Sequence, residues 1–448
     1  MKSITLISPR AKNDCASDIS VITSPLSGIL ILGTMLRDKG YHVKIYDESF
    51  KKPNYENIDS DIVLITSMSA TANRAYDLAD FFKEKGKKVY MGGLHVTFKP
   101  EEALKHCDKV VLGEGENVIF GLIENKTKKS IVKGLPVKNL DFIPMPDYSL
   151  VEGIKKHPDA VSVVTSRGCP FNCRFCSLKA MFGHKYRVVS TERIINYISQ
   201  FKRLKKLCFD EPNFTADKKR AKEILDQMKE HGITPKYAWP SVSIDVANDE
   251  ELLKKCSEVS NFHFAIGLES INQKVLDSYN KKQTPEIIKN NVKKIKDYGI
   301  KVFGSFIFGS DHDTKKDFQR TVDFCKDADI DFPTFSALTP YVGTDVRKQL
   351  EKELKKISKY EVLIIDEVGY TQQTRDEMEV LFTLLAQRYE KASVMITSNL
   401  PFSKWEQIFK DPLTTAAAID RLVHHSIILE FNIPSYRVEK AKQKKERR

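Results

Sequence analysis

Short apolar runs alternate with amphipathic segments over roughly the first 125 residues of the chain. This alternation indicates buried strands that are connected by helices. The predicted strands are Ser3–Ser8, Tyr41–Tyr46, Ile62–Thr66, Lys88–Met91 and Lys109–Leu112. The predicted helices are Leu30–Lys39, Ala72–Lys85 and Pro100–His106. We therefore expect an α/β domain over residues 1–125 with a doubly wound, Rossmann-like parallel sheet.

Ligands of such a sheet bind beside the loops that follow the carboxyl ends of its strands. Those loops are expected at 8–10, 47–49, 66–71, 92–98 and 113–116. Residues 126–158 are rich in proline and show no clear periodicity, which predicts an ordered linker to a second domain.

The alternation resumes at residue 159 and gives six strand–helix units up to residue 345. The predicted strands are Val161–Thr165, Lys205–Phe209, Lys236–Ile244, Phe262–Ile266, Lys301–Phe308 and Phe332–Leu338. Long helices are predicted at Asp217–His231 and Pro285–Tyr298. Six units are two short of a closed barrel, so we expect a partial (β/α)6 TIM-type barrel, with its chemistry on the loops after the strands.

Three of the eight cysteines lie within eight residues, directly after the first barrel strand. They are Cys169, Cys173 and Cys176, in the segment TSRGCPFNCRFCS. Thiolates bind soft metals and iron–sulfur clusters, and three cysteines on a four-iron cluster leave one iron open for another ligand. The alternatives are a structural zinc site with His184 as fourth ligand, or three unligated cysteines.

The C-x3-C-x2-C spacing, with Phe175 before the last cysteine, resembles the cluster loop of the radical S-adenosylmethionine (radical SAM) enzymes. The resemblance implies a 4Fe–4S cluster on Cys169, Cys173 and Cys176, with S-adenosylmethionine on the open iron. One electron from the cluster would then cleave S-adenosylmethionine to a 5′-deoxyadenosyl radical. Phe175 would pack near the adenine.

The same resemblance extends to three later strand ends. Glu211 and Glu269 stand where relatives place acidic residues near the amino group and ribose of S-adenosylmethionine, so they are expected as catalytic and cofactor-binding residues. The alternative for both is an ordinary surface carboxylate. Gly309 is expected as a further cofactor-binding residue, and it opens a segment in which Asp311 and His312 replace the Pro-Gly of relatives. His312 is expected to be a hydrogen-bonding residue of the loop.

The first domain resembles the cobalamin-binding domain that precedes many radical SAM domains. The resemblance is carried by SPLSGILILGTMLRDKGYHVKIYDE, by GGLHVTFKPEEAL and by GEGE at 113–116. It implies cobalamin as a third cofactor. The Asp-x-His-x-x-Gly motif that supplies a histidine to cobalt is absent, and His95 is not assigned to cobalt. A sheet domain without a cofactor is the alternative.

A different pattern begins near residue 350. The segment VLIIDE (362–367) predicts a strand that ends in two acids, followed by a helix over Arg375–Tyr389 and a strand within 393–405. SIILEF (426–431) predicts a last strand. The pattern over 350–440 resembles the C-terminal half of the IstB-like ATP-binding proteins, which help insertion sequences transpose.

The IstB-like resemblance implies a fragment of a P-loop NTPase-type α/β domain. Asp366 and Glu367 would be its Walker B pair, Asn399 its sensor residue and Arg421 its arginine finger. The Gly-x4-Gly-Lys-Ser/Thr loop that cradles the nucleotide phosphates occurs nowhere in the 448 residues. We therefore expect vestigial residues without ATPase activity, and a chimeric fusion of two unrelated sequences near residues 344–352.

The formal net charge of +12 adds little to the functional interpretation. The last nine residues, KAKQKKERR, carry six basic residues and one acidic residue, so 441–448 predicts a basic disordered tail. Nucleic acid is expected as a partner only through the C-terminal region. The sequence shows neither a secretory leader nor an apolar run of the ~20 residues that span a bilayer, and we expect a cytoplasmic protein.

The leading hypothesis is a radical SAM enzyme that modifies a small or lipid-like organic substrate. Methyl transfer or rearrangement with cobalamin is expected, and flavodoxin or ferredoxin is expected to donate the electron. The alternative is an IstB-like transposition accessory that binds DNA or a transposase and lacks ATPase activity.

Overall fold

The computed structural model divides the chain into two compact units, Met1–Lys348 and Gln349–Arg448. It describes residues 2–10, 26–154, 158–201, 204–368, 381, 384–386, 388–389, 391–409, 416, 419–420, 422–424 and 426–430. None of the helices in these ranges is long and apolar enough to cross a membrane.

The first sheet has six parallel strands in the order β2-β1-β3-β4-β5-β6. The strands are β1 (Ser3–Ser8), β2 (His42–Asp47), β3 (Ile62–Thr66), β4 (Lys88–Gly92), β5 (Lys109–Leu112) and β6 (Ile131–Lys133). The strand order reverses between β1 and β3, and a sheet of this kind binds its ligand at the carboxyl ends of the strands near such a reversal.

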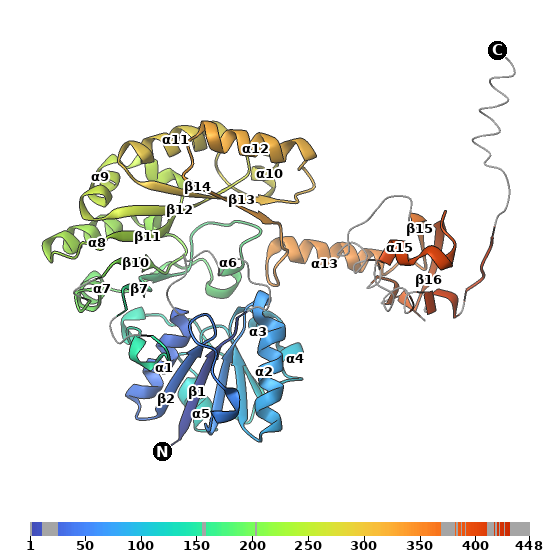
Figure 1. Cartoon of the computed structure of the whole chain (residues 1–448), viewed down its shortest axis with the longest axis horizontal. Helices are drawn as coiled ribbons and strands as arrows, with labels where there is room; N and C mark the ends of the chain where they lie inside the picture. The colour runs from blue at the N-terminus through green and yellow to red at the C-terminus, as the bar shows by residue number, and fades with distance from the viewer. Residues whose placement is uncertain are drawn as a thin grey trace, which may run out of the picture. The chain divides into compact units, whose positions relative to one another are not determined.

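Helices cover both faces of this sheet (Figure 1). They are α1 (Ser27–Asp38), α2 (Ala72–Glu84), α3 (Leu94–Phe98), α4 (Pro100–Ala103) and α5 (Ile119–Ile123). Successive side chains of a strand point to opposite faces. On β1, Leu6 accordingly packs in the cluster that contains α1, whereas Ile7 packs in the cluster that contains α2.

Two segments in and after the first sheet differ from the sequence-based expectation. The expected loop 92–98 contains the short helix α3. The expected linker 126–158 contributes β6, which pairs with β5, and two 3-10 turns, η4 (Leu140–Phe142) and η5 (Tyr148–Leu150). Three-residue strands and single turns are too short to show a periodic pattern.

The second sheet has six parallel strands in the order β14-β13-β12-β11-β10-β7. The strands are β7 (Ala160–Val163), β10 (Lys206–Phe209), β11 (Tyr237–Val242), β12 (Asn261–Glu269), β13 (Lys301–Phe308) and β14 (Phe332–Ala337). Each strand pairs with the next one in the chain, as in a TIM barrel, and the expected partial barrel is confirmed.

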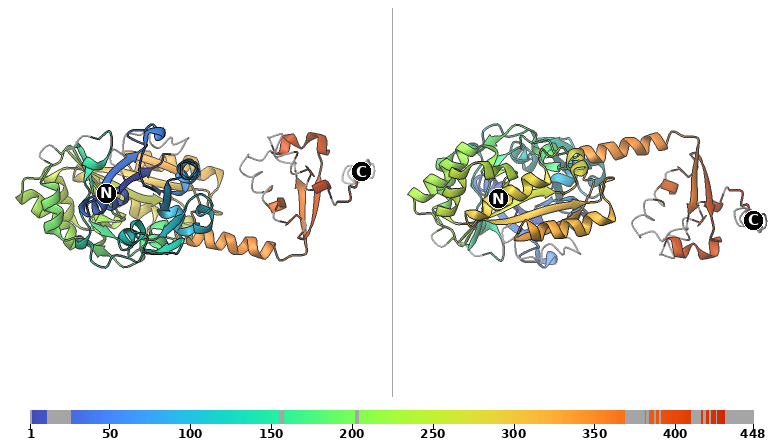
Figure 2. Two further views of the ribbon diagram at one scale, coloured as in Figure 1. Left: turned by 90° about the horizontal axis from the view of Figure 1, so that it is seen from below. Right: turned by 90° about the horizontal axis from the view of Figure 1, so that it is seen from above.

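The helices of the barrel lie on the outer side of its strands, as Figure 1 and the further views of Figure 2 show. They are α7 (Thr191–Ile198), α8 (Lys218–Glu230), α9 (Glu250–Val259), α10 (Gln273–Ser278), α11 (Pro285–Asp297) and α12 (Lys315–Asp327), with α13 (Asp345–Ile357) after the last strand. The short helix α6 (Ser177–Phe182) is not part of this outer layer and lies in the long loop between β7 and α7. Side-chain caps start several of them: Asp217 accepts a hydrogen bond from the amide of Arg220, and Asp249 accepts one from the amide of Leu252.

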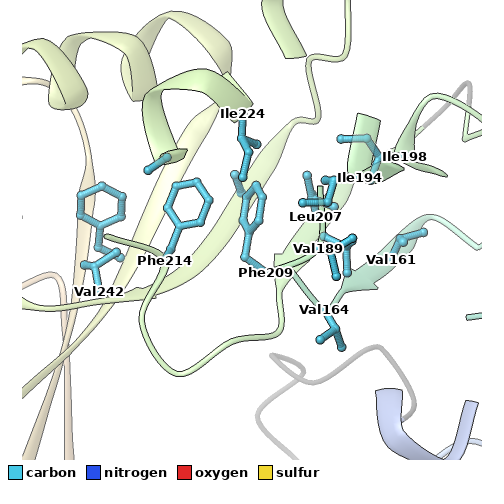
Figure 3. Close-up of a cluster of buried hydrophobic side chains, with 14 of the residues drawn as sticks. Val161, Val164, Val189, Ile194, Ile198, Leu207, Phe209, Phe214, Ile224 and Val242 are labelled. Carbon is cyan, nitrogen blue, oxygen red and sulfur yellow. The ribbon is translucent and has the colours of Figure 1, made fainter. Parts of the chain in front are cut away.

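The core between these strands and helices is aromatic and aliphatic (Figure 3). Leu207 and Phe209 of β10 are buried on the face that meets the helices, and they alternate with the partly buried Lys206 and Cys208. The rings of Phe209 and Phe214 are 4.5 Å apart between centroids. This packing fixes the end of β10, where a candidate site residue follows.

The second unit contains the parallel pair β15 (Val362–Val368) and β16 (Ser393–Ser398), with η8 (Phe402–Lys404) and α15 (Glu406–Phe409). Its described core is small and consists of Val368, Leu385, Trp405 and Ile408. Residues 426–430 form no strand, so the expected last strand is wrong for these residues, and Ile427 is 90% exposed. Most of the helix expected at Arg375–Tyr389 and the tail 441–448 lie outside the described residues.

Candidate functional site

The cysteine loop leaves and re-enters the barrel through two short antiparallel strands, β8 (Ser166–Arg167) and β9 (Arg187–Val188). Gly168 follows β8 with a φ of +86°, and a Cβ atom there would lie 2.2 Å from the carbonyl oxygen of Lys185. Only glycine fits this position. The three cysteines lie between these strands and are all partly exposed.

The loop is held against the segment that follows α10. The amide of Arg174 donates to the carbonyl of Tyr279 at 3.2 Å, and the side-chain amide of Asn280 donates to the carbonyl of Asn172 at 2.9 Å. Phe175 packs edge-on against Tyr279, with ring centroids 5.2 Å apart. The expected adenine-binding residue therefore has an aromatic neighbour that sequence reasoning did not identify.

The three thiols of the loop lie close enough together to affect one another's pKa. Burial raises the pKa of Cys169 and of Cys173, Cys176 raises each further, and Lys281 lowers both. Within the described residues no three His, Cys, Asp or Glu side chains converge as they would around a single ion. His184 is exposed. Three thiols on one loop fit a four-iron cluster, in which each cysteine binds a different iron, better than a zinc tetrahedron.

Glu211 is buried just after β10, with a residue exposure of 7%. Its carboxylate accepts hydrogen bonds from the hydroxyl of Thr165 and, at 2.5 Å, from the hydroxyl of Ser166. Burial raises the pKa of Glu211, and these hydroxyl groups and the charge of Arg220 offset part of the rise. Glu211 is therefore not a surface carboxylate, and it lies beside the end of the strand that leads into the cysteine loop.

Glu269 is the last residue of β12 and is likewise buried. It has a φ of +64°, and the pairing of β12 with β13 shifts register between Gly267 and Glu269. Lys281 lies 3.1 Å from Oε1 of Glu269. Burial raises the pKa of Glu269, and Lys281 works against that rise. Lys281 thus pairs with the second acid, and its charge also lowers the pKa of Cys169 and Cys173, although no pattern in the sequence singles it out.

Gly309 follows β13 with a φ of +107°. Asp313 accepts hydrogen bonds from the amides of Gly309 and Ser310, both at 2.8 Å. Its other carboxylate oxygen is buried without a partner among the described residues. His312 is exposed, and its carbonyl accepts a hydrogen bond from Asn272 at 3.0 Å. Asp313 is a further candidate polar group of the site, which sequence reasoning missed.

The loop 113–116 of the first sheet reaches the base of the cysteine loop. Oε2 of Glu114 lies 3.0 Å from Arg167 and 3.0 Å from Arg187, and Glu116 lies 2.5 Å from Arg167. Burial alone would raise the pKa of Glu114, but hydrogen bonds from Arg187 and from the Val137 amide, with the charges of both arginines, hold it below its usual value. The carboxyl edge of the first sheet therefore adjoins the cysteine loop.

The loops after β3 and β4 pack closely against each other at this edge of the first sheet. Gly93 has a φ of +100°, and a Cβ atom there would stand 2.7 Å from the carbonyl oxygen of Ser67. The ring nitrogens of His95 lie 3.4 Å from Ser69 and 3.3 Å from Glu102. His95 therefore has hydrogen-bond partners within its own domain.

Two of the residues expected from the ATPase-like pattern, Asp366 and Glu367, contact the same hydroxyl group on β16. Asp366 accepts a hydrogen bond from the hydroxyl of Thr397, and the amide of Glu367 donates to the same hydroxyl at 2.8 Å. Asn399 is exposed, and Arg421 lies outside the described residues.

The chain combines a doubly wound sheet with a six-stranded partial barrel. Three thiols and two buried acids lie at the strand ends of this barrel. This arrangement defines a cofactor-dependent α/β enzyme. The chain matches the B12 binding domain over residues 22–123, the radical SAM superfamily over 163–325 and the IstB-like ATP binding proteins over 343–445. The chain belongs to the radical SAM superfamily, in the group that carries a B12 binding domain, and it continues into an IstB-like segment.

The chain aligns with two relatives over most of their length. An uncharacterized methyltransferase of Pyrococcus horikoshii is 33% identical over 358 residues, which is 72% of this chain and 77% of the relative. A bacteriochlorophyllide d C-8(2)-methyltransferase of Chlorobaculum tepidum is 32% identical over 336 residues, which is 70% of this chain and 73% of the relative.

Solved structures share the fold. The radical S-adenosylmethionine methyltransferase TsrM from Kitasatospora setae superimposes with a TM-score of 0.63 at 15% identity, covering 79% of this chain and 76% of that one. These matches confirm the fold class, the enzyme class and the family's cofactors: a 4Fe–4S cluster, S-adenosylmethionine and cobalamin.

The C-terminal part of the chain matches a different family of proteins. An insertion sequence ATP-binding protein of Sinorhizobium fredii is 46% identical over 100 residues, which is 22% of this chain and 34% of the relative. The chain thus holds about a third of such a protein, and the predicted chimeric character of the sequence is confirmed.

Proposed function

We propose that the unit 1–348 is a cobalamin-dependent radical SAM methyltransferase that acts on an organic substrate. The observation that carries the proposal is the meeting of three groups: the cysteine loop, the buried acids Glu211 and Glu269, and the loop 113–116 of the B12 binding domain. Relatives whose names describe methyltransferases support methyl transfer rather than rearrangement.

Cys169, Cys173 and Cys176 would hold the cluster, and the loops after β3, β4 and β5 would hold cobalamin. When bound, the reduced cluster with S-adenosylmethionine supplies a carbon-centred radical, and cobalamin supplies a transferable methyl group. Phe175 and Gly309 would line the adenine side of the site. The unpartnered oxygen of Asp313 offers this side a hydrogen-bond acceptor.

Glu211 and Glu269 would hold the cationic amino group and the ribose of S-adenosylmethionine. A carboxylate whose pKa is raised by burial gains most from a cationic partner, because the partner removes the cost of an unpaired buried charge. Lys281 already supplies part of that compensation to Glu269. In these roles the two carboxylates position S-adenosylmethionine by charge and do not take part in electron transfer.

The proposal includes a one-electron donor of the flavodoxin or ferredoxin type, a cytoplasmic location and a small or lipid-like organic substrate. Ring-bearing substrates are favoured, because relatives are named for bacteriochlorophyllide methylation and for cyclization of a magnesium-protoporphyrin ester.

The test is anaerobic assembly of the full chain with iron, sulfide and hydroxocobalamin, followed by chemical reduction with dithionite and turnover with S-adenosylmethionine labelled in its methyl group. The proposal predicts S-adenosylhomocysteine and a methylated product from an added tetrapyrrole such as a bacteriochlorophyllide. A protein that binds both cofactors but moves no label to any of a panel of organic ring substrates would contradict it.

The second candidate function concerns residues 350–440 alone. The 46% identity to an insertion sequence ATP-binding protein favours binding of DNA or a transposase by this segment. Salt-sensitive DNA binding that persists after removal of residues 1–348 would support the DNA-binding role, and its absence from the full chain would exclude that role.

A further inference from the structure

The two strands at the base of the cysteine loop bring two arginines together. Arg167 on β8 is the register partner of Arg187 on β9. The two residues are only 7% and 6% exposed. Guanidinium groups keep their charge at any accessible pH, so two of them side by side away from water require anionic partners. The base of the loop depends on carboxylates from elsewhere in the chain.

Those carboxylates come from the loop that follows β5 in the first sheet. Glu114 contacts both arginines, and Glu116 contacts Arg167 alone. The amide of Val137 donates to Glu114 at 2.8 Å and fixes its orientation. Glu114 and Glu116 are 4% and 7% exposed. Two positive and two negative side chains are therefore sealed together between the first sheet and the barrel.

The same loop, 113–116, stands at the edge of the first sheet where ligands of such sheets bind. We propose that Glu114 is a positioning residue that couples cobalamin binding in the first sheet to the order of the cysteine loop. The identity of the ligand rests on the proposed function. A ligand that fixes this loop also fixes the Glu114 carboxylate, and through it Arg167 and Arg187.

Coupling of this kind works in both directions. If bound cobalamin strengthens the binding of the cluster by ordering the cysteine loop, the assembled cluster must strengthen cobalamin binding by the same factor. The expected consequence is that neither cofactor is retained fully without the other.

The test is the rate at which the assembled cluster of the full chain loses its iron to a chelator, followed by the visible absorbance of the cluster. Saturating hydroxocobalamin should slow the loss in the wild-type protein by roughly five-fold or more. Glu114→Gln keeps an amide oxygen for Val137 but removes the charge shared by the arginines. This variant should lose iron faster than wild type, and cobalamin should not protect it.

Asp331→Asn is the matched control. Asp331 is a nearly buried carboxylate that pairs with Lys301 at 2.8 Å and Lys296 at 3.4 Å and accepts from the amide of Val302 at 3.0 Å. It precedes β14, so it lies at the amino ends of the barrel strands, away from the cysteine loop. Iron loss and its slowing by cobalamin should match wild type in this variant.

Glu116→Gln serves if Glu114→Gln does not fold, because it removes only one of the two partners of Arg167. It should show a partial loss of protection. The proposal would be overturned if E114Q lost iron no faster than wild type, or if cobalamin still slowed its iron loss. It would also be overturned if cobalamin did not slow iron loss in the wild-type protein. Iron loss requires no turnover, so protection without any methylated product would contradict the proposed function and leave the coupling standing.

Discussion

Gly267 lies directly beside the carboxylate of Glu269, so closely that a Cβ atom at position 267 would stand 2.2 Å from Oε1 of Glu269. The ammonium group of Lys281 is 3.2 Å from the same Cβ position. The missing side chain of Gly267 is what allows Glu269 to fold back over β12 and remain buried beside Lys281.

Gly267→Ala is therefore expected to displace the Glu269 carboxylate. The yield of 5′-deoxyadenosine from S-adenosylmethionine should fall roughly 10- to 100-fold, because small displacements of a positioning group cost about that much. Gly121→Ala is the control, since a Cβ atom on this α5 glycine has no neighbour within 4 Å. G121A should match wild type, and a fully active G267A protein would contradict the assigned role of Glu269.

Glu211→Gln is expected to stabilise the protein without cofactors while it weakens S-adenosylmethionine binding. Burial raises the pKa of Glu211, so its contribution to stability is present below the ordinary glutamate pKa and is lost as pH rises through the raised value. The free energy of unfolding by urea should increase by about 1 kcal/mol at neutral pH, and the gain should vanish in acid. A variant that is less stable than wild type at neutral pH would show that the buried Glu211 carboxylate does not destabilise the folded protein.

Each of the three loop cysteines should be required for iron, whereas Cys208 should not. Cys208 lies on β10, outside the loop, and is only partly buried, so Cys208→Ala should retain wild-type iron and sulfide per chain. Cys169→Ala, Cys173→Ala and Cys176→Ala should each lose most of the visible absorbance after anaerobic assembly. Equal iron in all four variants would place the metal elsewhere in the chain.

The full chain is expected to show no magnesium-dependent ATP hydrolysis. The hydroxyl of Thr397 donates to Asp366, and no Gly-x4-Gly-Lys-Ser/Thr loop exists to hold the phosphates. A phosphate-release assay should give the same background for wild type and Asp366→Asn. Hydrolysis that D366N abolishes would show that the second unit binds nucleotide in another way.

Much of the fold could be predicted from the sequence, because long apolar runs fix both the strands and their faces. The bounds of β1, β3, β5 and β13 agree with the prediction to the residue. Short elements could not be predicted in this way: β6, β8 and β9 have two or three residues each, and α3 has five. The segment 426–430 has the composition of a strand, but no described strand lies beside it to pair with.

The site was predictable where one segment carries the motif, as for the three cysteines, or where an acid follows an apolar run, as for Glu211 and Glu269. The division into three domains, a linker and a basic tail and the roles of these residues remain predictions. Lys281 and Glu114 could not be found in this way, because each acts on a residue distant in the chain. Only the folded contacts show that GEGE binds the base of the cysteine loop.

The most direct test of the central claim is the product formed when the anaerobically assembled, reduced full chain meets S-adenosylmethionine. The account predicts 5′-deoxyadenosine from the wild-type protein and none from Cys176→Ala. A wild-type protein that carries zinc at this loop, or that holds an iron–sulfur cluster and releases no 5′-deoxyadenosine, would contradict it.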